Sequence, residues 1–136
     1  MKKSLYLFSC FFLGGGCATS QEPNYIYYKG SAPTSCNLII GLSQDDSQSV
    51  YKVTTDARSA TGIFFKSGQQ IIFSGLYAAD SFGDSKIEVS ALMEGDTLLI
   101  QNYGNSMNPF TLFSECDEKY LSLDRARTQQ GINTDY

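Results

Sequence analysis

The sequence predicts an all-β domain, a small antiparallel meander of about eight strands that closes into a barrel or folds as a sandwich. Apolar and polar residues alternate over 50–56 and 86–92, at the two-residue period of a half-buried strand. The apolar segments are separated by short connections rich in Gly, Ser, Asn and Asp. No segment carries a helical apolar stripe, and 136 residues suffice for one domain.

The first half of the domain contains three separate strands and a hairpin. The first segment of the domain is rich in Tyr and Ile, which favour a strand. Further along, a Ser67-Gly68 turn lies between two apolar runs. The expected strands are 24–30, 36–42 and 50–56, with a hairpin over 63–75. The polar or Gly-containing segments 31–35, 43–49 and 57–62 are expected to be connections.

The second half begins with a longer loop, 76–85, and ends in two closing strands. The expected strands are 86–92, 97–103, 110–116 and 120–125, with turns or loops at 93–96, 104–109 and 117–119. The β domain therefore spans 24–125, and the polar segment 126–136 is expected to be a disordered tail.

The N-terminus has the pattern of an export signal. Lys2 and Lys3 precede an apolar run, Leu5–Leu13, which is too short for a bilayer that needs about 20 residues. Three glycines and Cys17 follow, so residues 1–17 resemble a bacterial lipoprotein signal. The resemblance implies removal of residues 1–16, lipidation of Cys17, and a lipidated tether over 17–23. Ala18, where an Asp would favour retention at the inner membrane, implies transfer to the outer membrane.

Three alternatives remain open, because Leu13 lies one residue earlier than the lipoprotein pattern requires. The letters of residues 7–10, "LFSC", match that pattern better but leave a short apolar run. Cleavage after Ala18–Ser20 would release a soluble periplasmic or secreted protein. The uncleaved segment could also serve as a signal anchor.

The net charge of the mature chain indicates which kinds of partner it can bind. Removal of Lys2 and Lys3 leaves 8 basic against 14 acidic residues, a net charge of −6 with the terminal amine acylated. This balance favours a cationic protein partner and disfavours anionic lipid, while the membrane itself is contacted through the N-terminal lipid. Nucleic acid is not an expected partner, because phosphate backbones require clustered Lys and Arg. The tether reaches at most about 25 Å.

The four cysteines divide by position. Cys10 belongs to the signal and Cys17 is the lipidation site, which leaves Cys36 and Cys116 as an even pair in an exported chain. We expect a disulfide between them in an oxidising compartment. No metal site is expected, because two cysteines without any His cannot complete a tetrahedral site.

The sequence predicts no enzyme and no cofactor. Histidine is absent, which excludes His-based triads and general bases, and the Asp45-Asp46 and 80–85 carboxylates are interpreted as solvated turns. The loop 101–109 is the better binding candidate, since Tyr and Asn suit adaptable recognition surfaces. Its candidate residues are Asn102, Tyr103, Asn105 and Asn108, although Asn and Gly also occur in such loops for turn geometry alone.

A second resemblance concerns membrane-anchored lysozyme inhibitors, which are small acidic β-barrels with an early and a late Cys. This chain is similar in that layout, and "SGLY" at 74–77 resembles their S-G-x-x-Y loop, although the spacing is one residue short and the Trp segment is missing. The resemblance implies that Ser74 and Tyr77 border an inhibitory loop. The sequence thus predicts an outer-membrane lipoprotein that is a non-enzymatic binding module of the cell envelope. A lysozyme inhibitor and a structural or assembly component are the alternatives.

Overall fold

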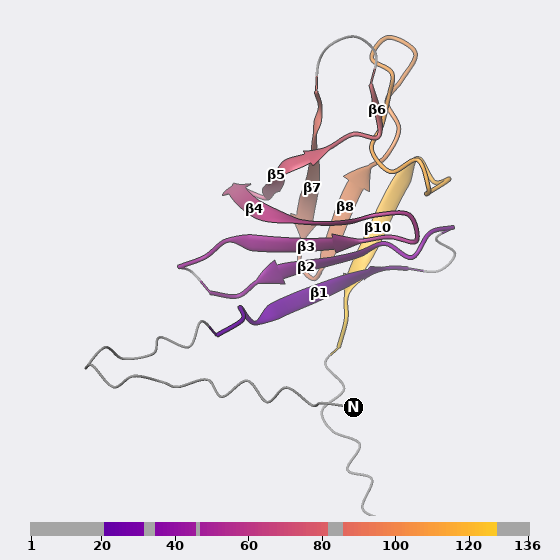
Figure 1. Cartoon of the computed structure of the whole chain (residues 1–136). Helices are drawn as coiled ribbons and strands as arrows, with labels where there is room; N and C mark the ends of the chain where they lie inside the picture. Colours follow the sequence, from indigo (N-terminus) through magenta and orange to yellow (C-terminus); the bar gives the residue numbers. More distant parts are fainter. Residues whose placement is uncertain (1–20, 32–34, 46, 82–85, 128–136) are drawn as a thin grey trace, which may run out of the picture.

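The computed structural model describes residues 21–31, 35–45, 47–81 and 86–127 (Figure 1). The signal over 1–16, the lipidation site Cys17, the tether up to residue 20 and the tail from 128 onward lie outside the described residues. The lipoprotein prediction therefore stays a prediction.

Eight strands form a closed antiparallel barrel in which each strand pairs with its neighbours in the chain. The bounds are β1 (Tyr25–Gly30), β2 (Ile39–Ser43), β3 (Val50–Thr54), β4 (Ser59–Ser67), β5 (Gln70–Tyr77), β7 (Glu88–Glu94), β8 (Thr97–Gln101) and β10 (Tyr120–Arg125). The first and last strands close the ring, with Tyr28 opposite Arg125 and Gly30 opposite Leu123. The domain is therefore a barrel and not a sandwich, and the described residues contain no helix.

Two further strands form a separate small sheet. β6 (Asp80–Ser81) pairs with β9 (Phe110–Thr111), with Asp80 opposite Thr111. In Figure 1, β6 lies above the barrel, away from β1. This sheet joins two connections that are far apart in the sequence.

The core fills the inside of the barrel. Inward residues alternate with outward ones along most of the barrel strands, with a break at the register shift in β5, and those at the centre, such as Ile40, Phe73, Val89 and Leu98, have no exposed surface. The rings of Tyr51 and Phe73 meet edge to face at 5.2 Å. An eight-stranded barrel is narrow enough for side chains to fill it. Because all barrel strands, this core and both disulfide cysteines lie within 25–125, the chain from Gln21 onward is a complete folding unit.

The two ends of the barrel differ. At one end, here called the proximal end, the chain enters β1 after Asn24 and leaves β10 at Ala126, whose N–H donates to the carbonyl of Tyr27. The described parts of the connections 55–58, 78–87 and 102–119 meet at the opposite, distal end, together with those of the β1–β2 connection.

Three expectations about strands were wrong. Only 110–111 of the predicted strand 110–116 is a strand, and it pairs outside the barrel. The apolar residues Leu112, Phe113 and Cys116 are buried at the end of the barrel, which explains their strand-like pattern. Residues 59–62, expected in a connection, belong to β4, and the expected loop 76–85 contains the end of β5 and all of β6.

Gly62 is required by the core. It lies opposite Tyr51, and a Cβ at this position would lie 2.7 Å from the Tyr51 hydroxyl oxygen and 2.9 Å from a ring carbon. We therefore expect Gly62→Ala to destabilise the domain by about 1–3 kcal/mol, the usual cost of overpacking. Urea denaturation measures it. In a Tyr51→Phe background the cost should shrink, because the nearest atom is gone; an undiminished cost would contradict this account.

Candidate functional site

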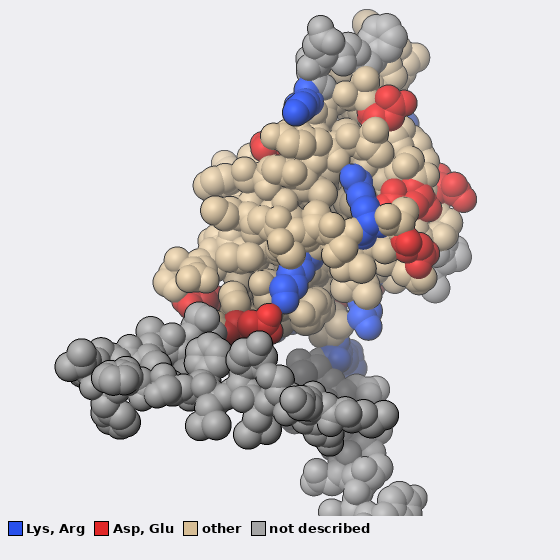
Figure 2. Space-filling model, viewed as in Figure 1, with Lys and Arg blue, Asp and Glu red and all other residues tan. Residues whose placement is uncertain are grey.

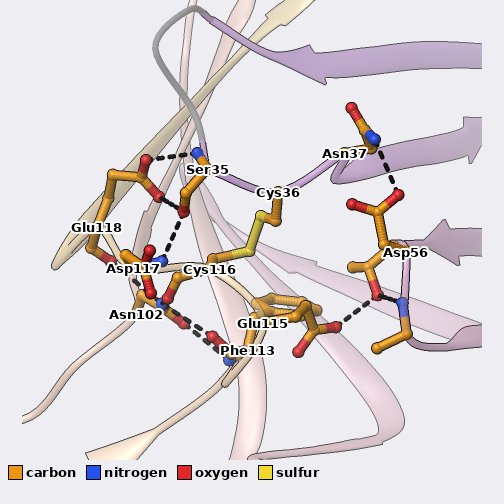
Figure 3. The surroundings of a disulfide bond; sticks show 12 residues. Ser35, Cys36, Asn37, Asp56, Asn102, Phe113, Glu115, Cys116, Asp117 and Glu118 are labelled. Atoms are coloured by element: carbon orange, nitrogen blue, oxygen red, sulfur yellow. Dashed lines mark hydrogen bonds between the residues drawn. A yellow bond between two sulfur atoms is a disulfide. The ribbon is translucent and has the colours of Figure 1, made fainter.

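A disulfide braces the distal end. Cys36 and Cys116 are bonded, with Cα atoms 5.0 Å apart, as the sequence predicted (Figure 3). The bond joins the β1–β2 connection to the connection between β9 and β10, across 80 residues of sequence. Both cysteines are buried.

Asn102 holds the same connection from the inside. Its side-chain amide donates toward the carbonyls of Phe113, Cys116 and Glu118 at 3.0–3.1 Å, and its oxygen accepts the Phe113 N–H at 2.7 Å (Figure 3). The residue is 0% exposed. This corrects its assignment as a binding residue: Asn102 positions the loop and offers no surface to a partner.

Glu118 and Ser35 form a second brace beside the disulfide. The Glu118 carboxylate accepts hydrogen bonds from the Ser35 hydroxyl at 2.9 Å and from the Ser35 N–H at 2.6 Å. These bonds stabilise the ionised form, so they hold the pKa of Glu118 below its usual range. The Ser35 hydroxyl oxygen also accepts the Asp117 N–H at 2.7 Å, which fixes the edge of the loop (Figure 3).

Arg58 closes the barrel at this end. Its guanidinium lies 4.6 Å from the centre of the Phe113 ring and donates to the carbonyls of Leu112 at 2.6 Å and Tyr77 at 3.3 Å. Its Nε faces the mostly buried Glu115 carboxylate at 3.5 Å, and that carboxylate accepts a hydrogen bond from the Thr55 hydroxyl. One side chain thus joins the β3–β4 connection to the end of β5 and to the connection between β9 and β10.

A concave site of about 330 Å³ opens beside these braces, between β6 and β9. We call it the distal pocket; its lining residues are Asp80, Ser81, Tyr103, Gly104, Asn105, Pro109, Phe110 and Thr111. The Tyr103 hydroxyl donates to the Cys116 carbonyl at 2.7 Å, which fixes the ring. Gly104 is necessary here, because a Cβ would lie 2.1 Å from the Asn108 carbonyl oxygen and 2.7 Å from the Phe110 ring.

Two of the predicted loop residues line this pocket. Tyr103 contributes a ring, and Asn105 caps a turn by accepting the N–H groups of Met107 at 3.0 Å and Asn108 at 2.8 Å. Asn108 is exposed on the same loop. The sequence did not indicate Asp80 or Phe110, because the β6–β9 pairing that brings them together links residues about thirty positions apart.

Ser74 lies within β5, and Tyr77 is its last residue. The whole "SGLY" segment belongs to β5, where the register shifts and Gly75 adopts a φ of +79°. The Ser74 carbonyl accepts the Tyr51 hydroxyl at 2.8 Å, and the half-exposed Tyr77 ring lies 5.3 Å from the Lys86 ammonium.

By its fold, the described chain is an up-and-down β-barrel with one disulfide and a braced loop end. No family model, no curated protein and no solved structure matches the chain. Within the described ranges, no group of three or more metal-binding side chains could hold an ion. The same part of the chain includes no helix that is long and apolar enough to cross a membrane.

Proposed function

We propose that this protein is a lipid-anchored, non-enzymatic binding module of the cell envelope, held at the outer membrane through Cys17, with the distal end as its binding surface. The proposal rests on the difference between the two ends of the barrel. The chain enters β1 at the proximal end, whereas the pocket and its braces lie at the distal end. A lipid on Cys17 would therefore direct the distal pocket away from the membrane that holds the protein.

The chemistry of the distal pocket supports binding. Tyr103 and Phe110 offer ring surfaces, Asp80 offers a carboxylate, and the Asn105 amide N–H groups point to no described acceptor. These are groups that orient a ligand by stacking and hydrogen bonding.

Rigidity and charge support the same conclusion. The disulfide, Asn102 and Arg58 hold the loops in place before any ligand arrives, so little conformational freedom is lost on binding. In Figure 2, acidic side chains gather on the right, at the distal end of the barrel. They favour a cationic protein partner at that end.

The anchor is tested by the intact mass of the protein from the membrane fraction of its native host. The proposal predicts the mass of residues Cys17 to Tyr136 plus acyl groups. A mass matching Gln21 to Tyr136 in the soluble fraction would reject the anchor, while leaving the distal pocket as a binding site of a free periplasmic or secreted protein.

The binding surface is tested by affinity capture from solubilised envelopes, with two matched variants. Asp80→Asn removes the pocket carboxylate, and Asp96→Asn makes the same change at the proximal end. We expect Asp80→Asn to reduce recovery of a cationic partner about tenfold, as loss of one charged hydrogen bond does, and Asp96→Asn to leave it unchanged. Equal recovery with both variants would rule out the distal pocket.

Lysozyme inhibition is the second candidate, supported by the closed barrel, the acidic charge and the disulfide between the early and late parts of the domain. Adding the purified domain to lysozyme should then lower lysozyme activity. No effect at micromolar concentration would end this alternative.

A further inference from the structure

A second concave surface runs along the outer face of β1 and β2, from Asn24 and Gln44 at the proximal end to Lys29 and Ile39. It measures about 640 Å³, and we call it the basic groove. Its lining residues are Asn24, Tyr25, Ile26, Tyr27, Lys29, Ile39, Gln44, Arg125, Ala126 and Arg127. The distal pocket shares none of these residues, so the two sites are separate.

Two tyrosine rings form the apolar part of the groove. Tyr25 and Tyr27 point outward from β1, with ring centres 6.0 Å apart. They lie over β2 because Gly41 leaves room there: a Cβ on Gly41 would be 2.8 Å from the Tyr27 ring and 3.3 Å from the Tyr25 ring. Tyr27 remains 41% exposed. Tyrosine is amphipathic and suits the boundary between water and an apolar layer.

The charged part of the groove is cationic. Lys29, Arg125 and Arg127 line it without any Asp or Glu, and the Lys52 ammonium lies 4.5 Å from the centre of the Tyr25 ring. These are half of the eight basic residues that follow Cys17 in a chain with excess acid. Figure 2 shows Lys and Arg side chains along the lower edge of the barrel, over β1.

Three acidic residues lie near these cations. Asp96 pairs with Arg125 at 3.5 Å, and Glu22 lies 3.9 Å from Lys52. Asp124 stands opposite Lys29 across the strands, but its carboxylate accepts the hydroxyls of Ser31 and Thr97. Asp96 and Asp124 do not line the groove but a neighbouring hollow, which shares residues 125–127 with it. Lys29 and Arg127 form no ion pair with any residue in the described ranges.

We infer that the basic groove binds the phosphate headgroup of an anionic phospholipid. Guanidinium and ammonium groups bind phosphate through charge-assisted hydrogen bonds, and the tyrosine rings would contact the glycerol and upper acyl region. A membrane is the source that the location favours, because Asn24 in the groove directly follows the proposed tether, which reaches at most about 25 Å. The groove would thus set the orientation of the domain on the lipid surface.

The negative net charge does not oppose this binding at close range. At physiological ionic strength, charges more than about 8 Å away are largely screened, so the local cations dominate the interaction. The expectation from net charge alone, repulsion by anionic lipid, therefore applies to the rest of the surface and not to this groove.

The test uses the chain from Gln21 to Tyr136, which is a complete folding unit without Cys17, so its outcome depends neither on the anchor nor on the distal pocket. Flotation compares vesicles of phosphatidylcholine alone with an equal mixture of phosphatidylcholine and phosphatidylglycerol. We expect binding to the mixed vesicles that weakens with added salt. Equal binding to both vesicles, or to neither, would overturn the inference.

Two double variants with the same net charge locate the binding surface. Lys29→Glu/Arg127→Glu reverses two groove cations, while Lys86→Glu/Lys119→Glu reverses two exposed cations of distal connections. Each basic residue at an anionic surface contributes about fivefold, so the groove variant should bind at least about twentyfold more weakly. The control should keep most of the binding. Equal losses in both variants would show a general charge effect and reject the groove.

A final experiment distinguishes a lipid headgroup from a free phosphate compound as the ligand of the groove. Soluble glycerol phosphate is titrated into the same protein and followed by NMR shifts of groove residues. Vesicle binding, with or without weak shifts from glycerol phosphate, supports the membrane source. Saturable binding of glycerol phosphate by a protein that does not bind the vesicles would overturn the inference that the ligand is a membrane lipid.

Discussion

The Cys36→Ala/Cys116→Ala variant is expected to lose about 4–5 kcal/mol of unfolding free energy and to melt about 15–20 °C lower than the parent. The bond closes a loop with a sequence separation of 80 residues, and in the chain-entropy model such a long loop restricts the unfolded chain strongly. It also adds a covalent link between the two distal connections that flank the β1–β10 pair and that the Ser35 hydrogen bonds join.

Thermal denaturation of three samples separates the cross-link from the cysteine side chains. The parent, the parent under reducing conditions and the double variant should give one high and two low melting temperatures. Both cysteines are buried, so a variant that melts below the reduced parent would report a small packing loss from the missing sulfur atoms. A double variant that melts within a few degrees of the oxidised parent would contradict the expected size of the effect.

Most barrel strands could be predicted because their information is local. β3 and β7 show a two-residue alternation, the β4–β5 hairpin has Gly68 at a φ of +59° where its turn was expected, and β10 has the predicted bounds 120–125. In each case neighbouring residues in the sequence determine which side chains face the core.

Closure of the barrel could not be predicted, because it depends on the pairing of the first and last strands, which the local sequence pattern does not specify. β1 meets β10 through Tyr28 and Arg125, nearly a hundred residues apart, and a sandwich would have shown the same alternation along each strand. The sequence therefore left barrel and sandwich open, and the register between the first and last strands decides between them.

The candidate site was predictable in part for a similar reason. Tyr103 and Asn105 were found because their loop has a recognisable composition, whereas Asp80 joins them only through the β6–β9 pairing. Asn102 has the composition of the same loop but lies inside, since it follows β8 directly and reaches the backbone of 113–118. Residue type alone does not distinguish an asparagine that binds a ligand from one that holds a loop.

Asn102→Leu is expected to cost about 2–5 kcal/mol, because it leaves the buried Phe113 N–H without a partner and removes one hydrogen bond from each of two carbonyls. The Phe113 carbonyl keeps the Cys116 N–H, and the Cys116 carbonyl keeps the Tyr103 hydroxyl. Each unpaired buried group costs about 1–3 kcal/mol. Urea denaturation at constant m-value measures the loss. Asn108→Leu, an exposed change on the same loop, should stay within about 0.5 kcal/mol of the parent. Comparable stability of both variants would show that the Asn102 hydrogen bonds contribute little.

Asn102→Asp is expected to make the cost of a change at this position depend on pH. The new carboxylate would face three backbone carbonyls in a buried site, so burial and repulsion would raise its pKa in the folded state above about 3.9, the unfolded value. A raised folded-state pKa means that the variant is least impaired below pH 4 and loses stability, relative to the parent, as the pH rises. The comparison must be made at each pH.

The unfolding free energy of the parent depends on pH in the opposite direction. Hydrogen bonds lower the folded-state pKa of Glu118, through Ser35, and of Asp124, through Ser31 and Thr97. Their contribution is present at neutral pH and is lost as the pH falls through these lowered values. Both proteins share these contributions, which cancel in the difference between them. The difference in unfolding free energy between Asn102→Asp and the parent should therefore grow from acid to neutral pH through the new carboxylate alone. A difference independent of pH would mean that the new carboxylate has left the interior, and that the loop between β9 and β10 can open without unfolding the barrel.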